Sequence, residues 1–563
     1  EALDWLVIGV FFLALIGIIV WVVRQKQNDS ADYFLGGRDA TWLAIGASIF
    51  ASNIGSEHLI GLAGAGASSG MAMAHWEIQG WMILILGWVF VPFYSRSMVY
   101  TMPEFLERRY NPQSRTILSV ISLVSYVLTK VAVTVYAGGL VFQQVFGIKE
   151  LWGIDFFWIA AIGLVVLTAL YTIFGGMKSV LYTSVLQTPI LLLGSLIILV
   201  LGFKELGGWD EMMRVCGAVT VNDYGDTMTN LIRSNDDANF PWLGALIGSA
   251  IIGFWYWCTD QFIVQRVLSG KNEKEARRGT IFGAYLKLLP VFLFLIPGMI
   301  AFALHQKYIG AGGEGFLPML ANGTANADAA FPTLVAKLLP AGVKGLVVCG
   351  ILAALMSSLA SLFNSSAMLF TIDFYKRFRP ETPEKKLVGI GQIATVVIVI
   401  LGILWIPIMR SVGDVLYTYL QDVQSVLAPG IAAAFLLGIC WKRTSAQGGM
   451  WGLIAGMVIG LTRLGAKVYY SNAGEVADST FKYLFYDMNW LFFCGWMFLF
   501  CIIVVIVVSL ATEAPTAEKI QGLVFGTATK EQKAATRASW DHWDIIHTAI
   551  ILAITAAFYW YFW

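Results

Sequence analysis

Charged residues are scarce in this chain. Only 13% of its 563 residues are Asp, Glu, Lys or Arg, whereas soluble domains contain about a quarter. Hydrophobic residues make up 58%, and the mean hydropathy is +0.71. This composition excludes a soluble globular protein and predicts a chain embedded in a lipid bilayer.

Signals of several other functions are missing as well. The 37 basic and 36 acidic residues nearly cancel and form no long run, so nothing indicates a nucleic-acid partner. The six cysteines lack paired or metal-like spacing, which argues against a disulfide framework or a metal centre. No nucleophile–base pair or metal motif is present, so we predict neither an enzyme nor a bound cofactor. No obligate protein partner can be inferred.

Apolar stretches recur along the whole chain. A membrane-spanning helix needs about 20 predominantly apolar residues. We predict fourteen spans, at residues 4–23, 43–67, 78–98, 114–143, 153–173, 179–202, 242–260, 276–305, 343–374, 387–409, 414–439, 448–468, 488–511 and 545–562. The first has no basic leading region and no small-residue cleavage site, so we expect a retained span and not a signal peptide.

Basic residues are distributed unevenly between alternate loops. One set of loops holds 24 of the 37 Lys and Arg residues, and the other holds 11. Basic loops remain in the cytoplasm. We therefore predict a multi-pass protein of the plasma or inner membrane with both termini extracellular or periplasmic. The two long loops, 203–240 and 306–341, would also lie outside.

One apolar segment is interrupted at mid-span. From Ser48 to Gly66 it reads SIFASNIGSEHLIGLAGAG, with Asn53, Glu57 and His58 at its centre. Polar groups are costly in lipid, so we expect the helix to break here and to line a wet cavity. The glycines at its end equally fit a packing face between helices, and the sequence leaves both interpretations open. Glu57 has no predicted role.

A second segment is interrupted at residues 253–261, GFWYWCTDQ. Its span begins five spans after the first, and because five is odd it would enter the membrane in the opposite sense. Paired broken helices in two inverted halves are typical of a central site in secondary transporters. The repeats would comprise segments 2–6 and 7–11.

Several ionisable residues lie in or beside these spans. Lys287 is well inside an apolar run and needs a carboxylate or several oxygens as partners. Lys130 has the same requirement, and we expect a structural ion pair there. Glu77 either belongs to a site or extends to the interface. We expect Asp260 and Gln261 to cap backbone groups freed by the second interruption.

Aromatic and amide side chains accompany these charges. Tyr256 and Trp257 lie beside the second interruption, and Gln421 and Gln424 lie in segment 11. Together with imidazole, carboxylate and ammonium groups they suit a neutral polyol. Its ring carbons would pack on an aromatic face, and its hydroxyls would take hydrogen bonds.

Segment 9 is rich in hydroxyls, reading LMSSLASLFNSS at residues 355–366. Such hydroxyls can simply bond to the preceding helical turn. They can also hold an alkali cation together with carbonyls from an unwound helix, which segment 2 would supply. The residues alone leave both interpretations open.

Longer strings resemble a known family. From about Asp32 to about Leu461 the chain is similar to the sodium/glucose cotransporters of the sodium:solute symporter family, especially the animal glucose-transporting branch. The matching strings are FASNIGSEHLIGLAG, YTMPEFL, FWYWCTDQFIVQR, YLKLLPVF, LMSSLASLFNSSAMLFTIDFY and FLLGICWKR. The resemblance implies an all-α integral membrane protein with 14 transmembrane helices. Its core would be a leucine-transporter-like inverted five-helix repeat with a discontinuous first helix in each repeat.

This fold implies a division of the chain. Residues 1–40 would form a peripheral first helix and a cytoplasmic loop, and 41–203 the first five-helix repeat. Residues 204–240 would form an extracellular loop, 241–440 the second, inverted repeat, and 441–563 three peripheral helices.

The resemblance also implies a site, carried over residue by residue. The sugar-binding residues would be Asn53, His58, Glu77, Tyr256, Trp257, Lys287 and Gln421, with Gln424 beside them. The outer gate would comprise Leu62, Trp76 and Tyr417, and Tyr256 would block the inner exit. Sodium would bind the carbonyls of Ala51, Ile54 and Ala354 and the hydroxyls of Ser357 and Ser358.

Two positions depart from the family pattern. Gly253 stands where relatives have Asn or Thr, so we expect one sugar contact to be missing or replaced by water. Ser184 replaces an aspartate that, in relatives moving two sodium ions, is linked to the second ion. One sodium per sugar is therefore expected.

These observations predict a sodium-coupled symporter that imports a neutral monosaccharide of the glucose/galactose type by alternating access. Myo-inositol or an organic anion is the alternative substrate, although an anion would favour an arginine in the site and we find none at the centre of the central spans. From another class, the chain could be a sugar-gated ion channel or sensor.

Overall fold

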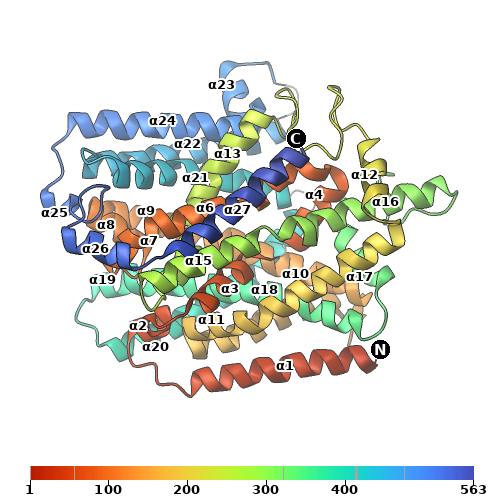
Figure 1. Ribbon diagram of the computed structural model, residues 1–563, viewed down its shortest axis with the longest axis horizontal. Helices are drawn as coiled ribbons and strands as arrows, with labels where there is room; N and C mark the ends of the chain where they lie inside the picture. Colours follow the sequence, from red (N-terminus) through yellow and green to blue (C-terminus); the bar gives the residue numbers. More distant parts are fainter. Residues whose placement is uncertain (1, 56, 321, 413–415, 474–475) are drawn as a thin grey trace.

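The computed structural model describes residues 2–55, 57–320, 322–412, 416–473 and 476–563, with side chains omitted at 128–129, 406, 408–412, 416–422 and 471. Almost all of this is helix (Figure 1). In the described part the sheet consists of two short antiparallel strands, β1 (Glu150–Leu151) and β2 (Ile154–Asp155). The all-α prediction is confirmed.

Eleven helical stretches of the described residues are long and apolar enough to cross a membrane. They are Ala2–Val23, Gly70–Ser97, Phe156–Leu206, Trp242–Thr259, Glu273–Gly310, Val343–Phe378, Glu384–Trp405, Val423–Cys440, Ala446–Tyr470, Trp490–Ala511 and His542–Tyr561. The multi-pass prediction is thereby confirmed.

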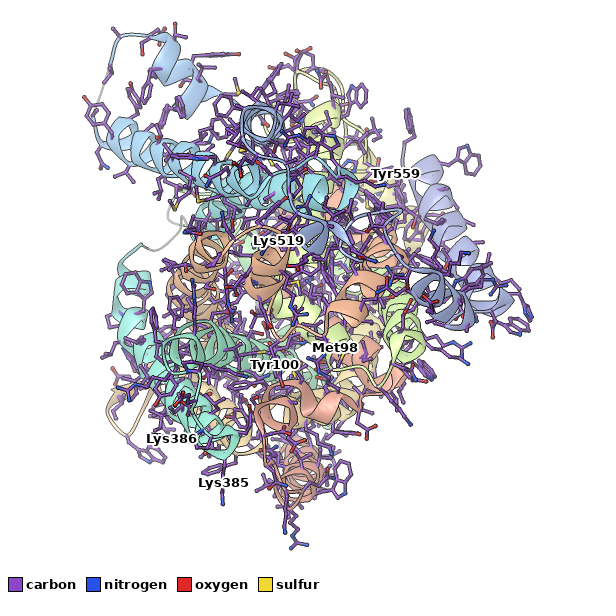
Figure 2. The ribbon with its side chains drawn as sticks, turned by 90° about the vertical axis from the view of Figure 1, so that its left-hand side faces the viewer. Met98, Tyr100, Lys385, Lys386, Lys519 and Tyr559 are labelled. Atoms are coloured by element: carbon purple, nitrogen blue, oxygen red, sulfur yellow. The ribbon has the colours of Figure 1, made fainter. Side chains whose placement is uncertain are left out.

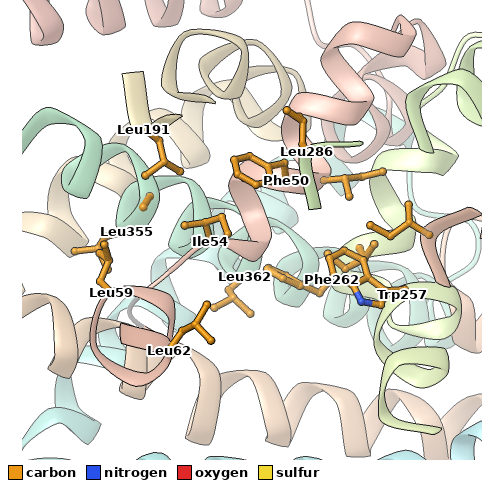
Figure 3. Packing of buried hydrophobic residues seen from close by; sticks show 14 of the residues in the cluster. Phe50, Ile54, Leu59, Leu62, Leu191, Trp257, Phe262, Leu286, Leu355 and Leu362 are labelled. Atoms are coloured by element: carbon orange, nitrogen blue, oxygen red, sulfur yellow. The ribbon is translucent and has the colours of Figure 1, made fainter. Parts of the chain in front are cut away.

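The first predicted interruption is a break in the helix. Helix α3 (Trp42–Asn53) ends before Ile54, whose φ of −79° and ψ of 114° are extended. The chain re-enters helix as the π-helix η2 (Glu57–Leu62), which continues into α4 (Ala63–Ser68). Figure 3 shows Phe50 and Ile54 on one half and Leu59 and Leu62 on the other.

The second predicted interruption is also a break. Helix α13 (Trp242–Phe254) passes into the π-helix η6 (Trp255–Thr259), and the chain is extended at Asp260 before α14 (Gln261–Leu268) begins. Both broken helices contribute side chains to the polar cluster described below.

Helix α11 (Phe156–Leu206) folds back on itself at Gly176, where φ is 58° and ψ is −147°. Ser179 Oγ donates to the carbonyl of Tyr171 at 2.9 Å, although these residues would lie about 12 Å apart along a straight helix. A Cβ at Gly176 would lie 2.3 Å from the Tyr33 carbonyl oxygen, so this position requires glycine. The element therefore comprises two helices.

The glycines after the first break serve helix packing. A Cβ at Gly66 would lie 2.2 Å from the Leu295 carbonyl oxygen, and one at Gly298 would lie 1.9 Å from that of Ala63. Helix α4 thus approaches α16 (Ile296–Gly310) backbone to backbone. Of the two interpretations of this stretch, the packing face is correct for Gly66.

Loop segments gather at two ends of the molecule (Figure 1). At one end lie α2 (Ser30–Leu35), α19 (Lys376–Phe378), α25 (Ala517–Ile520) and α26 (Lys530–Ala538), all from the basic set of loops. At the other end lie α12 (Trp209–Gly217) and α17 (Ala330–Leu338), from the two long loops.

Candidate functional site

A buried ion pair lies between the two broken helices. Lys287, the last residue of α15 (Glu273–Lys287), places Nζ 2.6 Å from Oε2 of Glu77 and 2.9 Å from Oδ1 of Asn53. Lys287 is 2% exposed and Glu77 is 7% exposed. Glu77 is the last residue of the short helix α5 (Ala74–Glu77). Because its carboxylate is buried and paired with Lys287, the interpretation of Glu77 as an interfacial side chain is wrong.

Residues on both sides of the first break join this pair. Asn53 is the last residue of α3, and its Nδ2 donates to the Tyr256 hydroxyl at 3.1 Å. His58 lies in η2, and its Nε2 is 3.2 Å from Glu77 Oε2. His58 Nδ1 is buried and has no hydrogen-bond partner among the described residues. It is available to a further polar group.

Two aromatic rings from the second break form a wall of the cluster. Trp257 is almost fully buried, and Lys287 Nζ lies 5.3 Å from its ring centroid, within the range of a cation–π contact. Tyr256 packs edge-on to Trp257 at 4.9 Å between centroids. Because Tyr256 also contacts Asn53, the two breaks meet directly at this point.

Gln79 is a member of this cluster that sequence reasoning missed. Its Oε1 accepts from Trp257 Nε1 at 3.3 Å, and its Nε2 donates to the Ser249 carbonyl at 2.7 Å. A Cβ at Gly253 would lie 2.7 Å from Gln79 Oε1. The Gln79 amide thus occupies the space that Gly253 leaves. The available signal was a second polar residue two positions after Glu77.

A second group of polar atoms lies where the first break meets α18 (Val343–Met368). A Cβ at Gly55 would lie 3.2 Å from Ser358 Oγ, so the unwound backbone approaches that hydroxyl closely. No backbone hydrogen bond to the carbonyls of Ala51 or Ile54 occurs among the described residues. These carbonyls also form the C-terminal end of α3, where the helix dipole favours a cation.

The neighbours of this group are largely buried. Ala51, Ile54 and Ala354 are at most 1% exposed, and Ser357 and Ser358 are 1% and 7% exposed. Ser184 Oγ lies 3.4 Å from Ser357 Oγ and donates to the Val180 carbonyl at 2.6 Å. The five predicted cation ligands thus lie at the junction of α3 and α18, with Ser184 beside them.

The other buried lysine is held at the second break. Lys130 Nζ lies 2.8 Å from Oδ2 of Asp260, and the Tyr126 hydroxyl donates to Oδ1 of the same carboxylate. Asp260 also accepts from the backbone N–H of Phe262 and so caps α14. Four aromatic rings lie 4.9–5.3 Å from Lys130 Nζ, those of Tyr126, Trp255, Tyr256 and Phe262. Asp260 is thus both the partner of Lys130 and a cap of α14. The side chain of Gln261, the other predicted cap, instead bonds the backbone of Met102 and Tyr100.

Glu57, which had no predicted role, lies in the π-helix that follows the first break. It is half-buried at the start of η2.

The predicted gate residues are only partly brought together. Leu62 is buried, whereas Trp76 stacks on Trp490 with centroids 5.5 Å apart and lies edge-on to Phe240. Gln424 is half-buried in α21 (Leu416–Cys440). The side chains of Tyr417 and Gln421 lie outside the described residues.

This arrangement suits reversible binding of a neutral, hydroxyl-rich molecule. The charges of Lys287 and Glu77 cancel, so the cluster offers donors and acceptors without a net charge. It contains ammonium, amide, imidazole and carboxylate groups beside aromatic faces, which can take hydroxyl groups and ring carbons respectively.

Comparisons with known proteins agree with this geometry. Residues 33–456 match the sodium:solute symporter family. The chain is 37% identical over 541 residues to sodium/myo-inositol cotransporter 2 of Mus musculus, covering 94% of this chain and 79% of the relative. It is 35% identical over 559 residues to sodium/glucose cotransporter 4 of Danio rerio, covering 96% and 83%.

A solved structure shares the fold. It is described as the substrate-bound outward-open state of a Na⁺-coupled sialic acid symporter, and it matches with a TM-score of 0.73 and 22% identity, covering 91% of this chain and 98% of that one. The relatives are sodium-coupled transporters and not enzymes. The chain belongs to the sodium:solute symporter family.

Proposed function

We propose that this sodium-coupled symporter imports a neutral monosaccharide of the glucose/galactose type. The observation that carries the proposal is the cluster in which Lys287 contacts both Glu77 and Asn53 between the two broken helices. His58 Nδ1 would bond a sugar hydroxyl, and Trp257 would pack against ring carbons.

Myo-inositol is the second candidate substrate. It is likewise a neutral six-membered ring of hydroxyls, and several of the similar relatives are sodium/myo-inositol cotransporters. The cluster described above contains no arginine, which an anionic substrate would favour. Glucose and myo-inositol differ in the hydroxymethyl group and the ring oxygen. Discrimination would depend on the amides that meet these groups, for which Gln79 and the predicted contacts Gln421 and Gln424 are the candidates.

Sodium would bind at the junction of α3 and α18, through the carbonyls of Ala51, Ile54 and Ala354 and the hydroxyls of Ser357 and Ser358. Support comes from the carbonyls of Ala51 and Ile54, which accept no backbone hydrogen bond from the described residues, and from the approach of Gly55 to Ser358. Hard cations prefer such oxygen ligands. Because Asn53 and His58 flank the same break, sodium would hold the broken helix in the shape that completes the sugar site.

Alternating access would use two gates. Leu62, Trp76 and Tyr417 would close above the sugar, and Tyr256 would close below it. The bond from Asn53 to Tyr256 supports a link between the sugar site and the inner gate. Loss of sodium to the cytoplasm would loosen the first break and release both the sugar and Tyr256.

The proposed topology has fourteen spans with both termini outside. Dividing α11 at Gly176 turns the eleven long stretches into twelve. The remaining two are α3–η2–α4 and the continuous run of α9 (Pro112–Ser125), η5 (Tyr126–Val131) and α10 (Ala132–Phe146). The division into 1–40, 41–203, 204–240, 241–440 and 441–563 is proposed on the same basis.

Contacts of the two chain ends support the proposed orientation. Asp4 accepts from the backbone N–H groups of Gly342 and Gly345, which follow one long loop. The Phe562 carbonyl accepts from Leu231, in the other long loop. Both termini thus contact segments of the poorly basic set.

We further propose one sodium per sugar. A second ion would require a carboxylate at position 184, whereas Ser184 has only a hydroxyl, which already donates to the Val180 carbonyl. A 100 mV potential contributes about 2.3 kcal/mol per charge, and a tenfold sodium gradient adds about 1.4 kcal/mol. One ion could then support roughly 500-fold accumulation. Simultaneous measurement of charge and sugar flux should give a ratio near one, and a ratio of two would refute this stoichiometry.

The direct test is uptake of labelled solutes into proteoliposomes that contain the full chain. Glucose, galactose, myo-inositol and a monocarboxylate are compared with and without an inward sodium gradient. Sodium-dependent accumulation of a hexose above its external concentration is expected. Accumulation of myo-inositol alone would favour the second candidate, and substrate-evoked current without accumulation would identify a channel or sensor.

A further inference from the structure

An apolar groove of about 690 Å³ opens on the surface of the molecule, where its lining residues Val124 and Ile393 are exposed. Its walls come from α9 and η5, from the π-helix η9 (Leu369–Tyr375) and from α20 (Glu384–Val412). Apart from the Tyr375 hydroxyl, its lining side chains are hydrocarbon throughout, for example Leu123, Phe370 and Leu401. Its volume is in the range of ligand-binding pockets.

The length of the groove matches one leaflet of a bilayer. Along α20 the lining extends from Ile390 to Leu401, which is about 16 Å at 1.5 Å per residue. The hydrocarbon core of a bilayer is about 30 Å thick, so this is half of it. An acyl chain of a single phospholipid would fill such a length.

Lys386 lies at the end of the α20 wall that is nearest to the loops. The lining positions Ile390, Ala394, Val397 and Leu401 follow the helical period. The same stripe, continued one turn toward the start of α20, reaches Lys386, which is exposed. Figure 2 shows Lys386 at the edge of the molecule's loop end. Lys385, the preceding residue, is also exposed but lies about 100° around the helix.

A second cation, Arg377, lies at the same end of the groove, beside the wall formed by α9 and η5. Thr116 lies seven residues before the lining residue Leu123 and eleven before Val127, so it shares their face of the helix. Arg377 Nη1 donates to Thr116 Oγ1. Arg377 is therefore placed beyond Tyr375 at the mouth of the groove, and its remaining N–H groups can serve a further acceptor.

The two cationic segments are close to one another. Lys376 Nζ lies 3.7 Å from Oε1 of Glu384, the first residue of α20. This ion pair connects the segment that contains Arg377 with the start of α20. Between 376 and 386 the chain has five basic residues and two acidic ones, a net charge of +3. The apolar groove therefore ends in a positively charged mouth.

We propose that this groove binds one phospholipid with an anionic head group. Its acyl chain would lie against α20 and η5, and its phosphate would be held between Arg377 and Lys386. The cytoplasmic leaflet is its source, given the proposed orientation of the basic loops. Anionic head groups attract basic side chains at this surface, and guanidinium groups bind phosphate oxygens in pairs.

Binding is tested by native mass spectrometry of the full chain in detergent, titrated with phosphatidylglycerol, phosphatidylcholine or glycerol 1-phosphate. One phosphatidylglycerol should be retained more tightly than phosphatidylcholine, and glycerol 1-phosphate should not bind. The double variant R377Q/K386Q should weaken phosphatidylglycerol binding about 25-fold, since each cation near the surface contributes about fivefold. The matched control K385Q should have a smaller effect than K386Q.

A location measurement on the unsubstituted chain keeps the proposal testable if the variants fold poorly. Phosphatidylglycerol with a photoreactive group on its acyl chain should label residues 387–401 or 117–127. Equal retention of phosphatidylcholine, unchanged binding by R377Q/K386Q, or labelling of other segments would each overturn the proposal. Displacement of the label by a sterol, with no effect of head-group charge, would overturn it as well.

Discussion

The two helix breaks are closed in different ways. At the second, Asp260 caps α14 and is itself held by Lys130 and Tyr126, so a buried ion pair lies at the break itself. At the first, the carbonyls of Ala51 and Ile54 have no backbone partner in the described part of the chain.

This difference indicates separate roles. A break that is closed by its own side chains keeps one geometry and can serve as a fixed support for Tyr256 and Trp257. If sodium binds the carbonyls of Ala51 and Ile54 as proposed, the shape of the first break depends on whether that cation is bound. Buried carbonyls are costly when unpaired, which supplies the driving force for binding.

The largest expected effect is on the second break. Asp260→Ala should lower the free energy of unfolding by about 3–5 kcal/mol, because it leaves Lys130 buried without its partner. Thermal unfolding of the purified chain measures the change. The double variant Lys130→Met/Asp260→Ala should recover part of the loss, since no unpaired charge remains. If Asp260→Ala alone unfolds like the unsubstituted chain, the second break is not held by this pair.

Substitution at the first break should affect coupling more than folding. Ser358→Ala should raise the sodium concentration for half-maximal uptake by about tenfold or more, since a bond to a charged group contributes on the order of 1.5–3 kcal/mol. Ser366→Ala, in the same helix and also buried, is the matched control and should leave sodium dependence unchanged. Normal coupled uptake by Ser358→Ala would remove Ser358 from the cation site.

The smallest effect is expected where the second break faces the polar cluster. Gln79→Ala removes the acceptor of Trp257 Nε1 and should raise the substrate concentration for half-maximal uptake about fivefold, the equivalent of about 1 kcal/mol. Adding Gly253→Asn should restore part of the affinity, because an amide would again occupy the same space. Unchanged uptake kinetics in Gln79→Ala would show that this amide does not position Trp257.

Periodicity and composition were sufficient for the general architecture. Long apolar runs predict membrane helices because a bilayer accepts little else, and polar residues at mid-span predict breaks for the same reason. Both breaks are present, at Ile54 and at Asp260. The requirement that a buried lysine find a carboxylate also predicted partners for Lys130 and Lys287, without naming which carboxylate each would take.

The pairings themselves depended on tertiary structure. Glu77 and Lys287 are 210 residues apart, and Lys130 and Asp260 are 130 apart. Local sequence carries no information about which distant helices will pack together. For that reason Glu77 could be mistaken for an interfacial carboxylate, and Gln79 could not be connected with Gly253. The sequence determined that two helices must break, whereas only the packing of α18 and η5 against them placed Ser358 beside the first break and the Lys130–Asp260 pair at the second.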